Sequence, residues 1–480
     1  MSFREHLEND EVDDMTQLKN IHEGSVLWNL RNRFVGSKFY TFIGSILVSI
    51  NPYTLHPQLY GLEMAKKYAS SSLGNKLRTQ SKISSNIHQI TSSGQLPPHL
   101  FAIGQAAYSA LVNQRQGQAI VLAGMAGSGK TECNKLILRY LTTVASSAKA
   151  NKITEQILEA STLLESFGNA KTLQNDNSSR FGKYLEIYFK TGGIIGAKIS
   201  TYLLEKSRIV TQNPEERSYH IFYELLSGLN QAEREKFGLL QADKYFYLNQ
   251  GTSDCSPNGS CKEWTSLQGA MQVLGFSEEE RDGIIRVLAS ILHLGNVYFY
   301  RKQLKHSMEG VELGSEGAEC KWASHLLEIS SEELIQSLKV RTTVTRNEVL
   351  FTPLTIDQAL DSRDAFAKAL YSGLFSWLIS RLNSVILKGG THDAQRMSIL
   401  DIYGFECLQE NSLEQLCINY ANESLQLFFN KLSFKMEQAE YVKERIEWTP
   451  LPWEDNLAII HLLMRKPVGI FHLLGKRDEL

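Results

Sequence analysis

Apolar and polar residues alternate with two different periods along the chain, and each period predicts one type of element. Short apolar runs bounded by turn residues are typical of strands, and they occur at 39–50, 118–123, 181–201 and 396–400. The first run contains a turn at Gly44–Ser45 and the third a turn at Gly192–Gly193, so each predicts a pair of strands.

Helical spacing of apolar residues dominates elsewhere. It predicts a helix from Cys133 to Val144 and mostly amphipathic helices from 268 to 390. It also predicts a long helix from about Ser412 to Glu447, with Asn411 as N-cap and Glu414 three residues on. Residues 75–96 are rich in Ser, Thr, Asn and Gln, so we expect an exposed or disordered loop there.

One glycine-rich stretch, VLAGMAGSGKTE (121–132), lies between a predicted buried strand and a predicted helix. Its G-x-x-x-x-G-K-T pattern is typical of a loop that binds phosphate. Gly124, Gly127 and Gly129 let the backbone curl so that N–H groups point inward, and the helix adds its positive end. Lys130 can reach the outer phosphates, and the Thr131 hydroxyl can bind Mg²⁺. A glycine-rich turn without a ligand is the alternative, which the flanking strand and helix disfavour.

Two other polar sites have chemistry that suits a nucleotide. Asp401 follows the predicted strand at 396–400, where it could anchor Mg²⁺ or serve as an ordinary cap or turn residue. The stretch NDNSSRFGK (175–183) could surround a triphosphate with hydroxyls, amides and an arginine, or it could be a solvated loop. Composition does not separate these alternatives.

Composition and charge exclude several classes of protein. The 480 residues are 42 % hydrophobic and 21 % charged, with 50 basic against 52 acidic residues, which predicts a sizeable core and argues against a general binder of nucleic acid or membrane surfaces. The N-terminus has no signal peptide, and no apolar run reaches transmembrane length. Six scattered cysteines without zinc spacing indicate reduced thiols of a cytosolic protein.

Three stretches in the order GMAGSGKTE, NDNSSRFGK and DIYGFE resemble the phosphate loop, switch I and switch II of myosin motor heads. Residues 203–226 and 411–430 also resemble this family, the second matching the start of its relay helix. The resemblance runs from about Asp13 to Leu474 and is strongest to class XV unconventional myosins. It implies an α/β fold of the P-loop NTPase type, with a central mixed sheet and large helical insertions, and an ATP-hydrolysing cytoskeletal motor that moves on actin filaments.

The resemblance also implies a role for each matching residue. ATP would be bound by Gly124, Met125, Ala126, Gly127, Ser128, Gly129, Lys130, Thr131 and Asn175, with Asn51, Pro52, Tyr53 and Tyr60 on the adenine side. Mg²⁺ would be bound by Thr131 and Ser179, with Asp401 one water further out. Ser178 and the backbone N–H of Gly404 would contact the γ-phosphate or the attacking water. Arg180 and Glu406 would pair as a gate that closes behind ATP.

The chain departs from the family pattern at two positions of the phosphate loop. Met125 replaces a glutamate and Ala126 a serine, so the backbone cradle is kept but a hydroxyl near the γ-phosphate is lost, which we expect to slow hydrolysis. Glu348 occupies a position that carries an acidic or phosphorylatable residue in an actin-facing loop of the family. It would let actin bind without phosphorylation, or it is a solvated surface residue.

The end of the sequence is a further departure, because GKRDEL does not match the family and the printed chain then stops. We therefore expect a tail at 1–12, a partial motor domain at 13–474 with an insertion at 75–96, and a divergent tail at 475–480. Such a truncated head would lack the converter and lever, so movement and light chains are not expected, and the strand at 118–123 would lose a neighbour. The alternative is a non-motor nucleotide-binding or inactive splice fragment. A P-loop kinase or GTPase fits less well, since no N-K-x-D motif is present.

Overall fold

The structure is a computed structural model that describes residues 11–54, 56–70, 96–145, 151–251, 260–303, 309–345, 348–387, 393–449 and 455–475. The expected insertion at 75–96 and both expected tails lie almost entirely outside these described residues. The chain divides into two compact units. Unit 1 comprises Met1–Leu122 and Gly129–Asp401, and unit 2 comprises Ala123–Ser128 and Ile402–Leu480.

A four-stranded mixed sheet forms the centre of unit 1. Its order is β3 (Gln118–Leu122), β12 (Gln395–Asp401), β6 (Gly182–Lys190) and β7 (Gly193–Tyr202). β12 runs parallel to β3 and antiparallel to β6, and β6 runs antiparallel to β7. The strands predicted in these regions are confirmed, and so is the mixed α/β fold class. Among the described residues β3 pairs only with β12, so it is an edge strand.

The parallel pairing of β3 and β12 positions the candidate site. Asp401, the last residue of β12, lies opposite Leu122, the last residue of β3. The carboxyl ends of the two strands therefore meet at one edge of the sheet, the edge where ligands bind in open α/β sheets. Strands far apart in sequence meet there because both are short apolar runs, with Ile120 and Ile399 buried.

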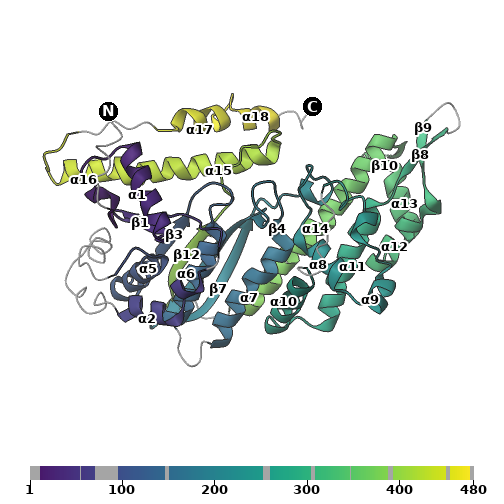
Figure 1. Ribbon diagram of the computed structural model, residues 1–480. Coiled ribbons are helices and arrows are strands. Elements are labelled where there is room, and N and C mark those ends of the chain that lie inside the picture. Colours follow the sequence, from purple (N-terminus) through teal and green to yellow (C-terminus); the bar gives the residue numbers. More distant parts are fainter. Residues whose placement is uncertain are drawn as a thin grey trace. The chain divides into compact units, whose positions relative to one another are not determined.

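Four helices of unit 1 pack on this sheet: α5 (Leu100–Gln114), α6 (Lys130–Val144), α7 (Asn151–Gly168) and α14 (Ile356–Ile386). α14 runs beside α7 (Figure 1). α5 and α6 meet closely because Gly104 faces Tyr140, and a Cβ atom at Gly104 would lie 2.8 Å from the tyrosine ring. Each fully buried apolar side chain in this core contributes about 1.5–3 kcal/mol.

The remaining helices of unit 1 are α1 (Glu23–Val35), α2 (Leu62–Ser70), α8 (His220–Gly228), α9 (Gln231–Phe237), α10 (Ser260–Val273), α11 (Glu278–Gly295), α12 (Ala318–Leu327) and α13 (Ser331–Lys339). Helices α11 to α13 surround a second apolar core that includes Leu294, Cys320 and Leu334. In the described part of the chain, no helix is both long enough and apolar enough to cross a bilayer.

The described residues of unit 1 also form four antiparallel strand pairs: β1 (Tyr40–Ile43) with β2 (Ile46–Ser49), β4 (Asn169–Ala170) with β5 (Ser178–Ser179), β8 (Phe299–Gln303) with β9 (Glu309–Leu313), and β10 (Val340–Val344) with β11 (Val349–Pro353). The first pair confirms the prediction for 39–50. The prediction of mostly helix for 268–390 misses the β8–β9 and β10–β11 hairpins. Both faces of β10 and β11 are largely exposed, so these strands carry no alternation of buried and exposed residues.

Unit 2 is built on a long helix. It begins with α15 (Leu413–Asn430), continues through a π-helical segment (Lys431–Met436) and ends with α16 (Glu437–Lys443). Helices α17 (Leu457–Met464) and α18 (Ile470–Gly475) pack beside α15 (Figure 1). Phe471 of α18 meets Tyr420 of α15 edge to face, with ring centroids 5.4 Å apart. The predicted long helix is thus confirmed, although it ends earlier than expected and contains an unpredicted π segment.

The start of the long helix corrects one prediction. Its N-cap is Ser412, and the Gln415 side chain accepts a hydrogen bond of 2.8 Å from the Ser412 backbone N–H. Asn411 is not the cap because its side chain already bonds both backbone groups of Leu408. Asn411 and Glu414 are therefore each one residue away from the expected capping positions.

Candidate functional site

The phosphate loop crosses from unit 2 into unit 1 between Ser128 and Gly129. Its first part shows why glycine is needed. Gly124 and Gly127 have φ angles of +154° and +76°, which side chains of L-residues rarely allow. A Cβ atom at Gly124 would also lie 2.7 Å from the Ser128 hydroxyl oxygen. Met125, one of the two departures from the family pattern in this loop, is exposed, so this replacement does not disturb the curl of the loop.

The predicted switch II residue Gly404 lies against the same loop within unit 2. A Cβ atom at Gly404 would come within 2.1 Å of the Ala126 backbone nitrogen, so only glycine fits at this position. The neighbouring residues Met125 and Phe405 form a parallel β-bridge. The structure thus brings together two segments that are about 280 residues apart in sequence.

The second part of the phosphate loop starts α6. Gly129 is the N-cap of α6, has φ +88° and provides no side-chain acceptor for the N–H groups of the first turn. The N-terminus of this 15-residue helix therefore has the positive potential that suits an anion. The Asn51 side chain approaches Gly129 closely, since its Cγ would lie 3.4 Å from a Cβ atom there.

Thr131 and Ser179 are the two residues whose hydroxyls were predicted to bind Mg²⁺. Their side-chain oxygens lie 3.1 Å apart, although 48 residues separate them. Adjacent oxygens around an octahedral Mg²⁺ with bonds of about 2.1 Å lie about 3.0 Å apart, so this pair fits two neighbouring ligand positions. Among the residues that the structure describes, no cluster of three His, Cys, Asp or Glu side chains suits a metal.

Asp401 is buried at the end of β12. Its Oδ2 accepts a hydrogen bond of 3.2 Å from the side-chain amide of Asn134 on α6. The amide holds the carboxylate at the end of β12, and the placement of Asp401 one water away from Mg²⁺ stays a prediction. The sequence prediction missed Asn134, although its position one helical turn after Lys130 was a usable signal.

The predicted switch I loop is held by hydrogen bonds within unit 1. Ser178 and Arg180 are buried, and Arg180 Nη1 donates to the Ser178 hydroxyl over 3.3 Å. The Asn175 side chain is bonded within its own loop, where it accepts from Asn177 N at 3.1 Å. Arg180 Nε also donates to Glu205 Oε2 at 2.6 Å, a buried partner that the sequence prediction did not include.

Glu406, the other half of the predicted gate, is held by the first turns of α15. Asn419 accepts from the Glu406 backbone N–H at 2.9 Å and donates to its carbonyl at 2.7 Å. Gln415 Nε2 donates to the Glu406 carboxylate at 3.4 Å, and Asn422 Nδ2 donates to the Tyr403 carbonyl at 3.1 Å. The amides of α15 thus fasten Tyr403 and Glu406 of the predicted switch II segment to the long helix. Gln415, Asn419 and Asn422 have helical spacing, which places them on one side of α15. This spacing was the sequence signal from which these contacts could have been predicted.

The residues expected on the adenine side belong to unit 1. Asn51 Oδ1 accepts from the Tyr53 backbone N–H at 3.0 Å, and the Tyr53 side chain is exposed. The Tyr60 hydroxyl bonds the Tyr40 hydroxyl at 2.6 Å, and its ring packs against His99. Burial raises the pKa of Tyr60. Asn51 is thus next to the phosphate loop, and a contact of Pro52, Tyr53 or Tyr60 with the base stays a prediction.

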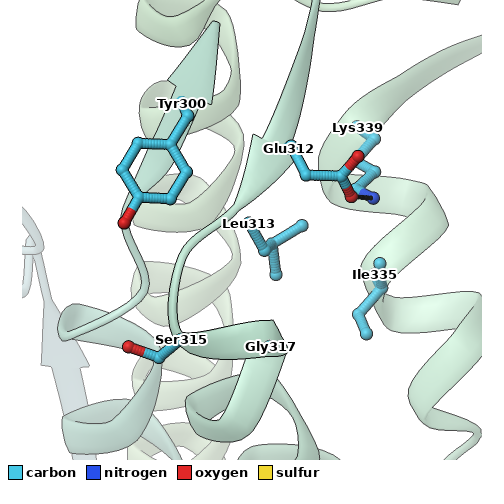
Figure 2. A pocket seen from close by; sticks show the side chains of 7 residues that line it. All are labelled: Tyr300, Glu312, Leu313, Ser315, Gly317, Ile335 and Lys339. Atoms are coloured by element: carbon cyan, nitrogen blue, oxygen red, sulfur yellow. Dashed lines mark hydrogen bonds and ion pairs between the residues drawn. The ribbon is translucent and has the colours of Figure 1, made fainter. Parts of the chain in front are cut away.

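A separate hollow of about 530 Å³ lies near the β8–β9 hairpin. Figure 2 shows Tyr300, Glu312, Leu313, Ser315, Gly317, Ile335 and Lys339 around it. Glu312 pairs with Lys339 at the rim, and Lys302 pairs with the same carboxylate. None of these residues was predicted to bind a ligand, and none belongs to the phosphate loop. This hollow is therefore not part of the candidate nucleotide site, which consists of the phosphate-loop, switch I and switch II residues described above.

Comparisons with known proteins agree with this arrangement. Residues 12–479 match the family model of the myosin head (motor domain). The chain is 47 % identical to human Unconventional myosin-XV over 479 residues. The matched region covers 99 % of this chain and 13 % of that protein. It is 41 % identical to Myosin-15 of Arabidopsis thaliana, over 98 % of this chain and 30 % of that protein. It is 42 % identical to Myosin-VIIa of Drosophila melanogaster, over 97 % of this chain and 20 % of that protein.

The chain spans less than a third of the length of each of these three relatives. Within the chain, however, the family model matches almost every residue, including the phosphate loop, switch I and switch II. The expected family resemblance is confirmed, and the chain belongs to the myosin head (motor domain) family.

Proposed function

We propose that this chain binds and hydrolyses Mg·ATP as the head of an unconventional, actin-based myosin motor. The observation that carries the proposal is the pair of hydroxyls from Thr131 and Ser179, 3.1 Å apart beside the start of α6. Phosphate-loop glycines alone are common to many nucleotide-binding proteins. A second hydroxyl from a separate loop, at a distance suited to Mg²⁺, supports a nucleotide held from both sides.

Some residues of the proposed site would bind the phosphates, and others would bind Mg²⁺ or orient the attacking water. Lys130 would neutralise the β- and γ-phosphates, and backbone N–H groups from Gly124 to Gly129 would surround them. Bound Mg²⁺ would supply neutralisation of the charge that develops on the transferred phosphoryl group. Ser178 and the Gly404 N–H would orient the attacking water, and Asp401 would anchor the metal through a water.

Arg180 and Glu406 are proposed to pair as a gate behind the nucleotide. They belong to different units of the chain, so the pairing rests on the family pattern. The Glu406 backbone is fixed by Asn419, which gives the carboxylate a defined starting point on the long helix. A charge pair that forms only on closure would exclude water and couple the phosphates to α15.

Actin is the proposed partner, and the cytoskeleton the proposed location. The β10–β11 hairpin exposes Val349, Leu350 and Phe351, which is an uncommon concentration of apolar side chains on a surface. Glu348 precedes them in the turn, where its backbone N–H bonds the Thr345 hydroxyl over 3.2 Å. The exposed apolar side chains of the hairpin support a contact with actin. The carboxylate of Glu348 would lie beside this contact without any need for phosphorylation. A role for Glu348 in actin binding remains a proposal.

The test compares nucleotide binding by the wild-type chain and by Lys130→Ala, using a fluorescent ATP analogue. Loss of a charged contact to phosphate is expected to weaken binding roughly 10- to 150-fold, equivalent to about 1.5–3 kcal/mol. Lys152→Ala is the control, because Lys152 is an exposed lysine on α7. Equal affinities of wild type and Lys130→Ala would contradict the nucleotide site.

Cosedimentation with actin filaments separates a motor head from a non-motor nucleotide-binding protein. A motor head is expected to bind filaments without nucleotide and to dissociate when ATP is added. A chain that binds ATP but shows no ATP-sensitive association with actin would favour the non-motor alternative.

A further inference from the structure

The predicted switch I loop, residues 171–180, is closed at both ends by one neighbouring segment, residues 205–217. At the first end, the Arg217 backbone N–H donates to the Lys171 carbonyl over 3.1 Å. At the second end, the Glu205 backbone N–H donates to the Arg180 carbonyl over 3.0 Å. The segment 205–217 is therefore the support on which the loop rests.

A buried chain of side chains joins the same two ends through the interior. Glu216 Oε1 accepts from the Leu173 backbone N–H at 3.4 Å, and Glu216 Oε2 lies 3.1 Å from Arg208 Nη2. Arg208 Nε and Arg180 Nε each lie 2.6 Å from the same oxygen, Glu205 Oε2. The relative exposure of the four charged side chains is between 1 % and 8 %.

Charge balance makes this chain of contacts cooperative. Two arginines alternate with two glutamates, so each buried charge has an opposite neighbour. Burial by itself would raise the pKa of the Glu205 carboxyl, but Arg180 and Arg208 overcome this effect and lower it to about 2. Glu205 is therefore ionised at neutral pH. Loss of Arg208 would leave Glu216 without its buried cation and Glu205 with only Arg180.

We propose that Arg208 and Glu216 are positioning residues that brace the nucleotide loop, so that the Arg180 guanidinium and the backbone at Leu173 hold their places together. Neither residue belongs to the set expected to touch ATP. The inference rests on the proposed function only in assigning the loop to a nucleotide, because the brace itself consists of contacts within unit 1.

Hydrogen–deuterium exchange of the nucleotide-free chain tests the brace directly. The reporters are the backbone amides of Leu173, Asn175, Asn177 and Arg180, each of which donates a hydrogen bond in the structure. Arg208→Met is expected to speed their exchange at least tenfold. Arg363→Met is the matched control, since Arg363 is a buried arginine that bonds the Val297 carbonyl away from this loop. It should change the four amides by less than twofold.

Two further variants keep the test decisive if Arg208→Met folds poorly. Glu216→Gln keeps the shape of the side chain, and it is expected to speed exchange at Leu173 about threefold or more. Arg208→Lys restores the charge without the planar fork of arginine, so it should recover part of the protection that Arg208→Met loses. Equal exchange in Arg208→Lys and Arg208→Met, or unchanged exchange in Glu216→Gln, would overturn the ionic brace.

Fluorescent ATP binding and single-turnover hydrolysis then connect the brace to the nucleotide. In Arg208→Met the hydrolysis step is expected to slow at least tenfold, while nucleotide affinity falls less than threefold, because the phosphate loop is unchanged. If wild type binds no nucleotide but Arg208→Met still loosens the loop, the brace stands and the proposed function fails. If wild type binds ATP and Arg208→Met leaves both the loop exchange and hydrolysis unchanged, the brace is wrong.

Discussion

The hydroxyl oxygens of Thr131 and Ser179 lie 3.1 Å apart, and they come from the start of α6 and from the short strand β5. The start of α6 and the predicted switch I loop thus bring two hydroxyls within hydrogen-bond distance of each other. Such convergence is a property of the folded chain, since the sequence places the two residues 48 positions apart.

Thr131→Ala is expected to weaken the effect of Mg²⁺ on nucleotide binding. Removing one of two protein ligands should raise the dissociation constant of Mg·ATP about tenfold, or about 1.4 kcal/mol, and should leave metal-free binding nearly unchanged. Titration of fluorescent ATP with and without Mg²⁺ measures both quantities. Thr143→Ala on the same helix is the control, because the Thr143 hydroxyl bonds the Arg139 carbonyl. An equal effect of both substitutions would remove Thr131 from the metal site.

Gly404→Ala is expected to displace switch II from the phosphate loop. The added Cβ atom would lie 2.1 Å from the Ala126 nitrogen, a backbone atom that cannot rotate away. Overpacking of this kind costs about 1–3 kcal/mol, and nucleotide affinity should fall at least tenfold. Gly283→Ala on α11 is the control, since nothing lies within 4 Å of its Cβ position. It should be neutral or stabilising by up to about 1 kcal/mol. Normal nucleotide binding by Gly404→Ala would show that the close approach is unimportant.

Glu224→Gln is expected to change how stability depends on pH. Burial raises the pKa of the Glu224 carboxyl to about 7, with a hydrogen bond from Ser166 acting in the opposite direction. Its Oε2 has no hydrogen-bond partner in the described structure. Because the folded pKa is above the unfolded value, the contribution of Glu224 to stability is fully present below about pH 4.5 and is lost as pH rises through 7.

At pH 8, Glu224→Gln should therefore be more stable than wild type by roughly 3 kcal/mol, and near pH 4.5 the two should be similar. Urea unfolding at both pH values measures the difference between the two free energies of unfolding. Glu279→Gln, at an exposed position on α11, controls for loss of an acidic residue as such. A constant difference between Glu224→Gln and wild type across this pH range would contradict the assignment.

The gate between Arg180 and Glu406 is tested by exchanging their charges. Each single substitution, Arg180→Glu or Glu406→Arg, should slow hydrolysis in a full-length head, and the double variant should recover part of the loss. Recovery should stay incomplete, because a glutamate at 180 would face the buried carboxylate of Glu205, which lies 2.6 Å from Arg180 Nε in the wild type. Single-turnover measurements give the coupling energy. Unchanged turnover in both single variants would rule out the gate.

The sequence by itself determined the local features of the site. The phosphate loop could be predicted because Gly124, Gly127 and Gly129 all have positive φ angles in the structure, a conformation that depends on residue type and not on distant contacts. The central strands were predictable for a similar reason, since short apolar runs such as 396–400 have few alternatives to burial in a sheet. The family resemblance then predicted which loops belong to one site.

Only the tertiary structure decided which side chains meet across long sequence separations. Asn134 bonds Asp401 from 267 residues away, and Glu205 holds Arg180 through a buried pair. The sequence places Asn134 one helical turn after Lys130, but it does not say which partner Asn134 or Arg180 meets, because the free energy of each contact depends on burial and on the exact distance between two elements. The β10–β11 hairpin was missed for the opposite reason, since strands exposed on both faces have no pattern of buried residues to reveal them.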